Sequence, residues 1–202
     1  KAIGALEGKY VLDACAAPGG KTLQLASLGA KVVAIDKSSS RLETLKKNLY
    51  RTNLSATVIQ ADLLKWMTKE TFDVILLDAP CTATGTIRRH PDLPILRNKD
   101  ELASAVTLQV DMIDKAVTLL KPSGQLIFST CSLLPDEGEN QVKTAKERHN
   151  LRAVNVSIKA LGLNSEWYNR GLGFIRLRPD YWSELGGMDG FFGLVIVLER
   201  SV

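Results

Sequence analysis

Cysteine, histidine and long apolar runs are all scarce in this chain of 202 residues. Its three cysteines are an odd number at distant positions, which argues against a disulfide framework and predicts reduced thiols in the cytoplasm. With two histidines and no cysteine at ligand spacing, we expect no metal site, and a Ser-His-Asp hydrolase has little to draw on. The longest apolar runs, such as residues 193–198, fall far short of the ~20 residues of a membrane-spanning helix. No membrane segment is therefore predicted.

The composition is that of an ordinary globular protein, with 45% apolar and 24% charged residues. Because a chain of this length fits one domain with a substantial core, we expect a single domain over residues 1–202. We also expect it to be a monomer. The net charge of +4 permits a polyanionic partner but does not require one.

Short apolar runs alternate along the chain with segments of helical spacing. The runs that predict strands are residues 10–14, 31–36, 56–62, 72–78, 124–130 and 190–200. The segments that predict helices are residues 20–29, 38–51 and 99–120. Strands that are apolar on both faces and separated by helices indicate an α/β fold whose parallel sheet is covered on both sides. Residues 151–189 show no period that predicts an element.

The stretch "VLDACAAPGGKT" (residues 11–22) ends like a phosphate-binding loop, but it departs from that motif. A Walker A loop needs a glycine where this chain has Cys15, and a dinucleotide fingerprint needs spaced glycines where Gly19 and Gly20 are adjacent. What remains is a strand, a turn of small residues and a helix start, where a ligand can approach the backbone closely. The alternative is a strand-to-helix turn that is merely tight.

Acidic residues end three predicted strands in succession: Asp36, Asp62 and Asp78. Ligands of open parallel sheets bind at the carboxyl ends of the strands. One such aspartate would more simply cap the following helix or turn, but three in a row favour a ligand that contains a nucleoside. Lys21 is the sole basic residue near the first turn, which fits a ligand without a pyrophosphate.

Two cysteines follow neighbouring predicted strands. Cys81 lies in "DAPCTATG" and Cys131 in "STCSLLPDEGEN". Adjacent strands would bring both thiols to one rim of the sheet. A cysteine is usually a buried structural residue, but loops rich in Pro, Thr, Ser and Gly fit that role poorly. A thiolate nucleophile is the sharper interpretation.

Three motifs together resemble those of the RsmB/Sun/NSUN family of RNA (cytosine-5) methyltransferases: "DACAAPGGKT", "DAPCTATGTIRRHPD" and "STCSLLPDEGENQV". The resemblance runs from Tyr10 to Val142 and returns at "GGMDGFF" (residues 186–192), and "IRRHPD" resembles the bacterial branch that modifies 16S ribosomal RNA. It implies a Rossmann-like class I methyltransferase fold with a mostly parallel seven-stranded sheet, an antiparallel last strand and helices on both faces. It also implies S-adenosyl-L-methionine as the methyl donor and RNA as the partner.

The resemblance also implies a set of donor-binding residues. Asp36 would bind the ribose hydroxyls, Asp62 would lie beside the adenine, and Asp78 would lie between donor and target base. The turn around the donor would comprise Cys15, Ala16, Ala17, Pro18, Gly19, Gly20 and Lys21.

In the family pattern the nucleophile is the cysteine of Thr-Cys-Ser, here Cys131, and the second cysteine, Cys81, assists product release. Asp78 and Lys21 are candidates to stabilise the charge that develops on the base. DNA cytosine-5 methyltransferases instead carry their nucleophile in a Pro-Cys motif after the fourth strand, which would be Cys81. The Thr-Cys-Ser setting of Cys131 favours the RNA family.

Basic residues after Cys81 are candidates for RNA contact, namely Arg88, Arg89 and His90. For Arg97 and Lys99 beyond them, contact with RNA and a role as part of a solvated basic loop are equally good interpretations. Family members carry an N-terminal RNA-binding region, whereas nine residues precede the first predicted strand, so we expect a catalytic domain without that region. Alternative functions are an idle methyltransferase-like scaffold, or methylation of tRNA or DNA.

Overall fold

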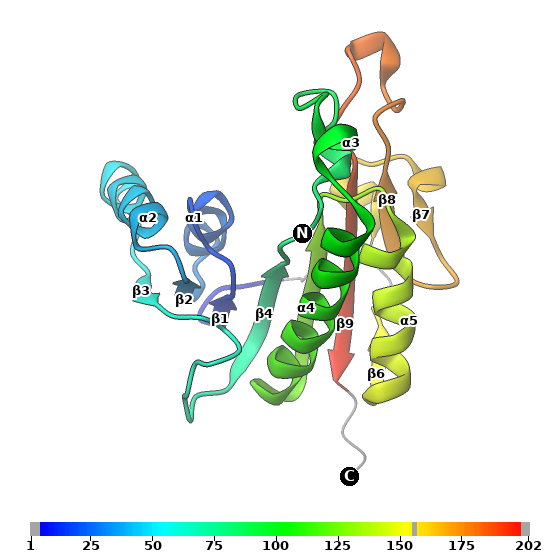
Figure 1. Ribbon diagram of the computed structural model, residues 1–202. Helices are drawn as coiled ribbons and strands as arrows, with labels where there is room; N and C mark the ends of the chain where they lie inside the picture. The colour runs from blue at the N-terminus through cyan, green and yellow to red at the C-terminus, as the bar shows by residue number, and fades with distance from the viewer. Residues whose placement is uncertain (1–4, 155–156, 199–202) are drawn as a thin grey trace.

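Nine strands form one sheet in the computed structural model, which describes residues 5–154 and 157–198 (Figure 1). The strands are β1 (Tyr10–Asp13), β2 (Lys31–Asp36), β3 (Thr57–Gln60), β4 (Phe72–Asp78), β5 (Leu120–Thr130), β6 (Leu151–Ala153), β7 (Tyr168–Asn169), β8 (Phe174–Leu177) and β9 (Phe191–Leu198). The α-helices are α1 (Gly20–Ser27), α2 (Ser39–Thr52), α3 (Leu93–Leu96), α4 (Lys99–Thr118), α5 (Glu139–Arg148) and α6 (Ile158–Leu161). Short 3₁₀ turns include η1 (Thr84–Thr86) and η2 (Pro135–Glu137).

The sheet order is β3-β2-β1-β4-β5-β9-β8-β7, and β6 also pairs with β9. Neighbours from β3 to β5 are parallel, whereas β9 runs antiparallel to β5. The predicted α/β class and the antiparallel last strand are thus confirmed. The order reverses between β1 and β4, which is the switch point where ligands of such sheets bind.

The expected number of seven strands was wrong for the described residues, which contain nine. Three strands, β6, β7 and β8, match none of the six apolar runs; they are two to four residues long and come from the segment in which the sequence showed no period. Strands that short complete too few alternations to give a pattern. Residues 199–200 of the last predicted strand lie outside the described residues.

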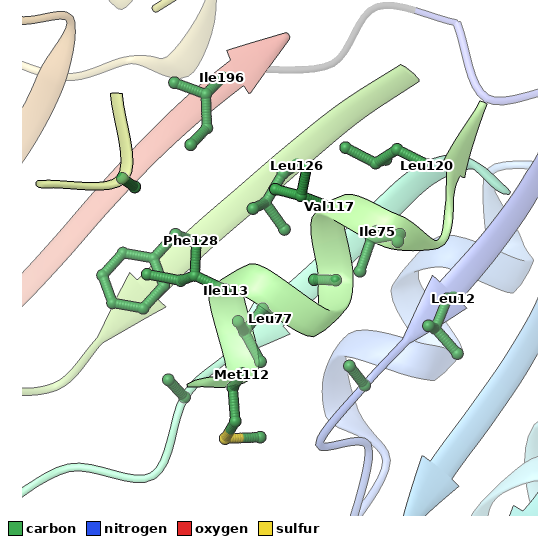
Figure 2. Packing of buried hydrophobic residues seen from close by; sticks show 14 of the residues in the cluster. Leu12, Ile75, Leu77, Met112, Ile113, Val117, Leu120, Leu126, Phe128 and Ile196 are labelled. Carbon is green, nitrogen blue, oxygen red and sulfur yellow. The ribbon is translucent and has the colours of Figure 1, made fainter. Parts of the chain in front are cut away.

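Alternating residues of the central strands explain why helices cover both faces. Val11, Val32 and Val74 pack with Leu25 of α1 on one face. The intervening residues Leu12, Ile75 and Leu77 face the other side, where Met112, Ile113 and Val117 of α4 lie over them (Figure 2). This period of two is what a strand buried on both faces requires. Because the helices cover the two faces of the sheet, we expect the functional site at the carboxyl ends of the strands.

Helix α4 begins where its sequence provides a cap. The Asn98 side chain accepts a hydrogen bond from the Glu101 amide at 2.9 Å, and the Glu101 carboxylate accepts one from the Asn98 amide at 3.3 Å. This capping box satisfies two backbone donors that a helix start would leave unpaired.

None of the described helices is long and apolar enough to cross a membrane.

Candidate active site

The carboxyl ends of β1, β2, β4 and β5 meet at one edge of the sheet. In the parallel register Asp13 of β1 pairs with Leu76 of β4, and Asp78 of β4 pairs with Ser129 of β5. Asp36 and Asp78 end β2 and β4, while the turn from Cys15 to Gly19 follows β1. Cys81 and its basic loop follow β4, Cys131 follows β5, and Asp62 follows the neighbouring strand β3. The sequence placed the candidates at strand ends, and strand order brings those ends together.

The turn between β1 and α1 requires glycine at its last position before the helix. Gly19 has φ +110°, and a Cβ there would lie 2.9 Å from Cγ of Leu45 on α2. Such a contact is closer than real Cβ atoms make, and the positive φ disfavours any L side chain. Gly19 therefore lets the start of α1 pack closely against Leu45 of α2.

Asp36 holds this turn in place. Its buried carboxylate accepts hydrogen bonds from the amides of Ala17 (3.1 Å) and Ser38 (2.9 Å). Arg41 of α2 donates to the Ala17 carbonyl and lies 3.7 Å from the same carboxylate. These two hydrogen bonds leave acceptor capacity on Asp36, because a carboxylate can accept about four hydrogen bonds.

A cleft of about 90 Å³ opens between Cys15, Asp36 and Asp62, and Arg41 lines it. It is smaller than the ~300 Å³ of an ordinary ligand pocket. Asp62 also accepts a hydrogen bond from the Leu64 amide at 3.0 Å, so it caps its own turn while lining the cleft. Asp36 and Asp62 thus share one concave surface.

Asp13 is a buried carboxyl group that the sequence reasoning did not single out, although it stands within the first motif. Its Oδ2 accepts a hydrogen bond from the Thr22 hydroxyl at 2.7 Å, and among the described groups none donates to its Oδ1. Burial raises its pKa to about 6, against a smaller opposing effect of the Thr22 hydrogen bond. A charged residue ending an apolar strand was the available signal.

Lys21 and Asp78 form an ion pair at the edge of the sheet where the parallel strands end. The Lys21 ammonium lies 2.6 Å from Oδ2 of Asp78, whose Oδ1 accepts a hydrogen bond from the Ser129 hydroxyl at 2.9 Å. Both side chains remain partly exposed. The pair joins the start of α1 to the end of β4.

Cys81 and Cys131 face each other with their Sγ atoms 3.4 Å apart. The hydrogen bond from the Cys81 thiol lowers the pKa of Cys131, while the same contact and then burial raise the pKa of Cys81. Lys21 also acts to lower the pKa of Cys131, and Asp78 acts to raise it. The arrangement favours a thiolate on Cys131 and a thiol on Cys81.

Cys15 has a different environment. Burial, with nearby carboxylates adding to it, raises the pKa of Cys15 to about 12. It therefore stays protonated and lines the cleft. The three cysteines are all unbridged, and the described residues contain no cluster of His, Cys, Asp and Glu that could hold a metal ion.

The basic loop after Cys81 is tied to the connection before β9. Arg89 lies 2.6 Å and Arg88 3.7 Å from carboxylate oxygens of Asp189, and Arg88 also donates to the Gly186 carbonyl at 3.1 Å. About half of each arginine side chain is exposed. His90 is exposed in the same loop.

Backbone contacts connect this loop to the thiols. The Gly85 amide donates to the Cys131 carbonyl at 2.8 Å, and the Gly190 amide donates to the Gly85 carbonyl at 2.7 Å. Arg97, which the sequence left open, donates to the Thr82 carbonyl at 3.2 Å. This hydrogen bond holds Thr82, the residue that follows Cys81.

A larger cavity of about 700 Å³ lies on the α1 side of the sheet. Its lining is mostly apolar, including Leu76, Ile127 and Val195, with Lys21 and Ser129 at its margin. Neither Asp36 nor the two facing thiols line it. We therefore place the candidate site at the strand ends and not in this second cavity.

Comparisons with known proteins identify the family of this chain. The family model described as 16S rRNA methyltransferase RsmB/F matches residues 2–193. The chain is 41% identical over 192 residues to ribosomal RNA small subunit methyltransferase B of Photorhabdus laumondii, covering 93% of this chain and 42% of that protein. The chain thus spans less than half the length of this curated relative.

Solved structures from Pyrococcus horikoshii have the same fold. NSun6, crystallised with SFG, superposes with a TM-score of 0.80 at 29% identity, covering 96% of this chain and 48% of that one. A methyltransferase homologue superposes with a TM-score of 0.79 at 31% identity, covering 98% and 64%. These neighbours confirm the Rossmann-like methyltransferase fold.

Proposed function

Because the chain belongs to the RsmB/F family of 16S rRNA methyltransferases, we propose that it transfers a methyl group from S-adenosyl-L-methionine to carbon 5 of a cytosine in RNA. We further propose that the RNA is small-subunit ribosomal RNA, as the names of its relatives suggest. One observation carries the cytosine-5 chemistry: the paired sulfur atoms of Cys131 and Cys81, on which the charges of Lys21 and Asp78 act.

The donor would supply an electrophilic methyl group on a sulfonium. The residues at the strand ends fit such a ligand, because Asp36 retains acceptor capacity for ribose hydroxyls and Asp62 lines the same cleft. The turn from Cys15 to Lys21 would surround the rest of the donor. Arg41 lines the same cleft with a half-exposed side chain and would lie beside the bound donor.

A nucleophilic thiolate is needed because carbon 5 of cytosine is a weak nucleophile in an aromatic ring. A Cys131 thiolate that bonds to carbon 6 breaks the aromaticity and places electron density on carbon 5, which then takes the methyl group. Loss of the carbon-5 proton to a base re-forms the ring double bond and expels Cys131. Cys81, whose Sγ lies 3.4 Å from that of Cys131, would assist this elimination.

Lys21 and Asp78 complete the chemistry. The Lys21 ammonium supplies positive charge against the negative charge that develops on the base, and Asp78 fixes the ammonium group by its ion pair. The target base must leave its stack to reach Cys131. Arg88, Arg89 and His90 would contact the RNA backbone beside it.

Trapping the covalent adduct tests the proposal. The protein would be incubated with S-adenosyl-L-methionine and a ribosomal RNA fragment, then resolved on a denaturing, non-reducing gel. We expect Cys81→Ala to accumulate a protein–RNA band, because elimination stalls, and Cys131→Ala to form none. The reverse pattern would assign the nucleophile to Cys81. Donor binding without a band in any lane would favour a scaffold.

A further inference from the structure

A carboxylate with no exposed surface lies beside the two thiols. Glu137 is 0% exposed and ends η2, the turn that follows Cys131. Its Oε1 accepts hydrogen bonds from the Thr82 amide at 2.9 Å and from Nε2 of Gln109 at 3.1 Å, and its Oε2 accepts one from the Thr82 hydroxyl. A buried charge is costly unless hydrogen-bonded, and here three donors satisfy it.

These donors come from segments that are distant in the chain. Thr82 directly follows Cys81, and it lies 55 positions before Glu137. The backbone carbonyl of Glu137 in turn accepts a hydrogen bond from the hydroxyl of Thr130 at 3.0 Å. Thr130 directly precedes Cys131. Glu137 is therefore hydrogen-bonded to the residue next to each of the two cysteines.

Other polar groups brace the same junction. Gln109 of α4 also donates to the Pro80 carbonyl at 2.9 Å, and Gln141 donates to Oε1 of Gln109 at 3.3 Å. Both glutamine side chains are buried. Together with Arg97 on the Thr82 carbonyl, they hold the residues on either side of Cys81. The position of the Cys81 sulfur is thus set by a network in which Glu137 is the shared acceptor.

The charge of Glu137 acts unequally on the two thiols. Cys81 faces Cys131 and the Glu137 carboxylate, which adds to the rise in its pKa. Cys131 faces Cys81, the Asp78 carboxylate and the Lys21 ammonium. Negative charge behind Cys81 opposes a thiolate there, while the thiol that remains can donate to Cys131.

We propose that Glu137 is a positioning residue: it clamps the Cys81 loop to the Cys131 turn and so determines which of the two thiols keeps its proton. It does not touch the substrate. Only the naming of Cys131 as nucleophile depends on the proposed function. The clamp itself is a property of the protein without RNA or donor.

Residue-resolved alkylation tests this directly. The protein alone would be treated with iodoacetamide between pH 6 and 9, and each cysteine followed by peptide mass spectrometry. We expect Cys131 of the unaltered protein to react at lower pH than Cys81. In Glu137→Gln the gap between the two profiles should shrink, with Cys81 reacting about tenfold faster at a fixed pH for each unit by which its pKa falls.

Matched variants separate charge from fold. Asp136→Asn removes an exposed charge one residue away, whose carboxylate accepts a hydrogen bond from Asn140, and should leave both profiles unchanged. Glu137→Asp keeps the charge and should preserve the order of reactivity. Thr82→Val removes one hydrogen bond and keeps the charge, so it replaces Glu137→Gln if that variant does not fold, with a smaller increase at Cys81 expected.

The outcomes are distinguishable from a failure of the proposed function. Unchanged alkylation profiles in folded Glu137→Gln, or in Thr82→Val where it replaces that variant, would overturn the inference. A wild-type protein in which Cys81 reacts first would overturn both the inference and the choice of nucleophile. In methyl transfer, Glu137→Gln should lower kcat at least tenfold with little change in KM for the donor. A change in KM alone would contradict a role at the thiols.

Discussion

Cys81 and Cys131 are 50 positions apart in the chain, yet their sulfur atoms lie 3.4 Å apart at the ends of adjacent parallel strands. In this contact the Cys81 thiol donates a hydrogen bond to Cys131, the more acidic of the two cysteines. It also predicts how the pair responds to oxidation.

Mild oxidation should join these two cysteines and spare Cys15. Diamide removes one hydrogen from each thiol and is itself reduced to the hydrazine, so the intact mass should fall by about two daltons because two hydrogens leave when an S–S bond of ~2.05 Å forms. Methyl transfer should stop and return with dithiothreitol. Peptide mapping checks the pairing, and a bridge to Cys15 would contradict the geometry.

Replacing Gly19 should destabilise the protein far more than replacing its neighbour. Gly19→Ala places a Cβ at φ +110°, 2.9 Å from Leu45, and should cost about 1–3 kcal/mol of unfolding free energy. Gly20→Ala is the matched control, because its Cβ would meet nothing within 4 Å apart from its chain neighbours and the backbone of its own helix. Urea unfolding measures both, and equal midpoints would count against the described turn.

The stability of the protein should depend on Asp13 between about pH 4 and 6. The pKa of this carboxyl is raised from 3.8 to about 6 in the folded state, so the folded state binds more protons than the unfolded state in that window. Stability from this group should therefore fall as pH rises, by about 3 kcal/mol at most. Asp13→Asn should flatten this part of the curve of unfolding free energy against pH. An identical slope in the variant would refute the assignment.

Lys21→Met should reduce methyl transfer without unfolding the protein. The ammonium pairs with a partly exposed Asp78, so its loss costs little stability but removes charge stabilisation from the reacting base. We expect kcat to fall about 10²-fold. Single-turnover kinetics measure the effect, with Lys46→Met on the exposed face of α2 as control. Comparable rates for both variants would exclude Lys21 from the chemistry.

Arg89→Ala should weaken RNA binding at all sequences tested. Its ion pair with Asp189 is half-exposed, so little stability should be lost. Loss of one phosphate contact should reduce the slope of log K against log salt by about one. Titration of labelled RNA at several salt concentrations gives the slope. If binding is unchanged, Arg89 serves to tie its loop to the segment before β9.

The Asp residues at the strand ends show how far a pattern reaches. Asp36, Asp62 and Asp78 were placed by apolar runs that end in an acid, and the structure puts Asp36 and Asp62 on one cleft. Their neighbours were not predictable in the same way. Arg41 lies in the predicted helix over residues 38–51 without any such pattern, but its guanidinium donates to the Ala17 carbonyl and lies beside Asp36.

The basic loop shows the opposite limit. Arg88 and Arg89 were predicted to meet phosphates, and their partner Asp189 is 100 positions or more along the chain, in a segment without a readable period. Pairing between two surface segments depends on how each loop is carried by its strands. Charge alone does not reveal it.

The sequence by itself determined the alternating apolar runs, the helix starts and the three motifs, because these depend on neighbours within a few residues. Tertiary structure alone decided which thiol is paired with which, and that Glu137 is buried against Thr82 and Thr130, the neighbours of the two cysteines. A glutamate in "PDEGEN" reads as a solvated charge. It becomes a buried acceptor only because strand order brings Thr82 and Gln109 around it, and only a folded chain can repay the desolvation of that carboxylate with three hydrogen bonds.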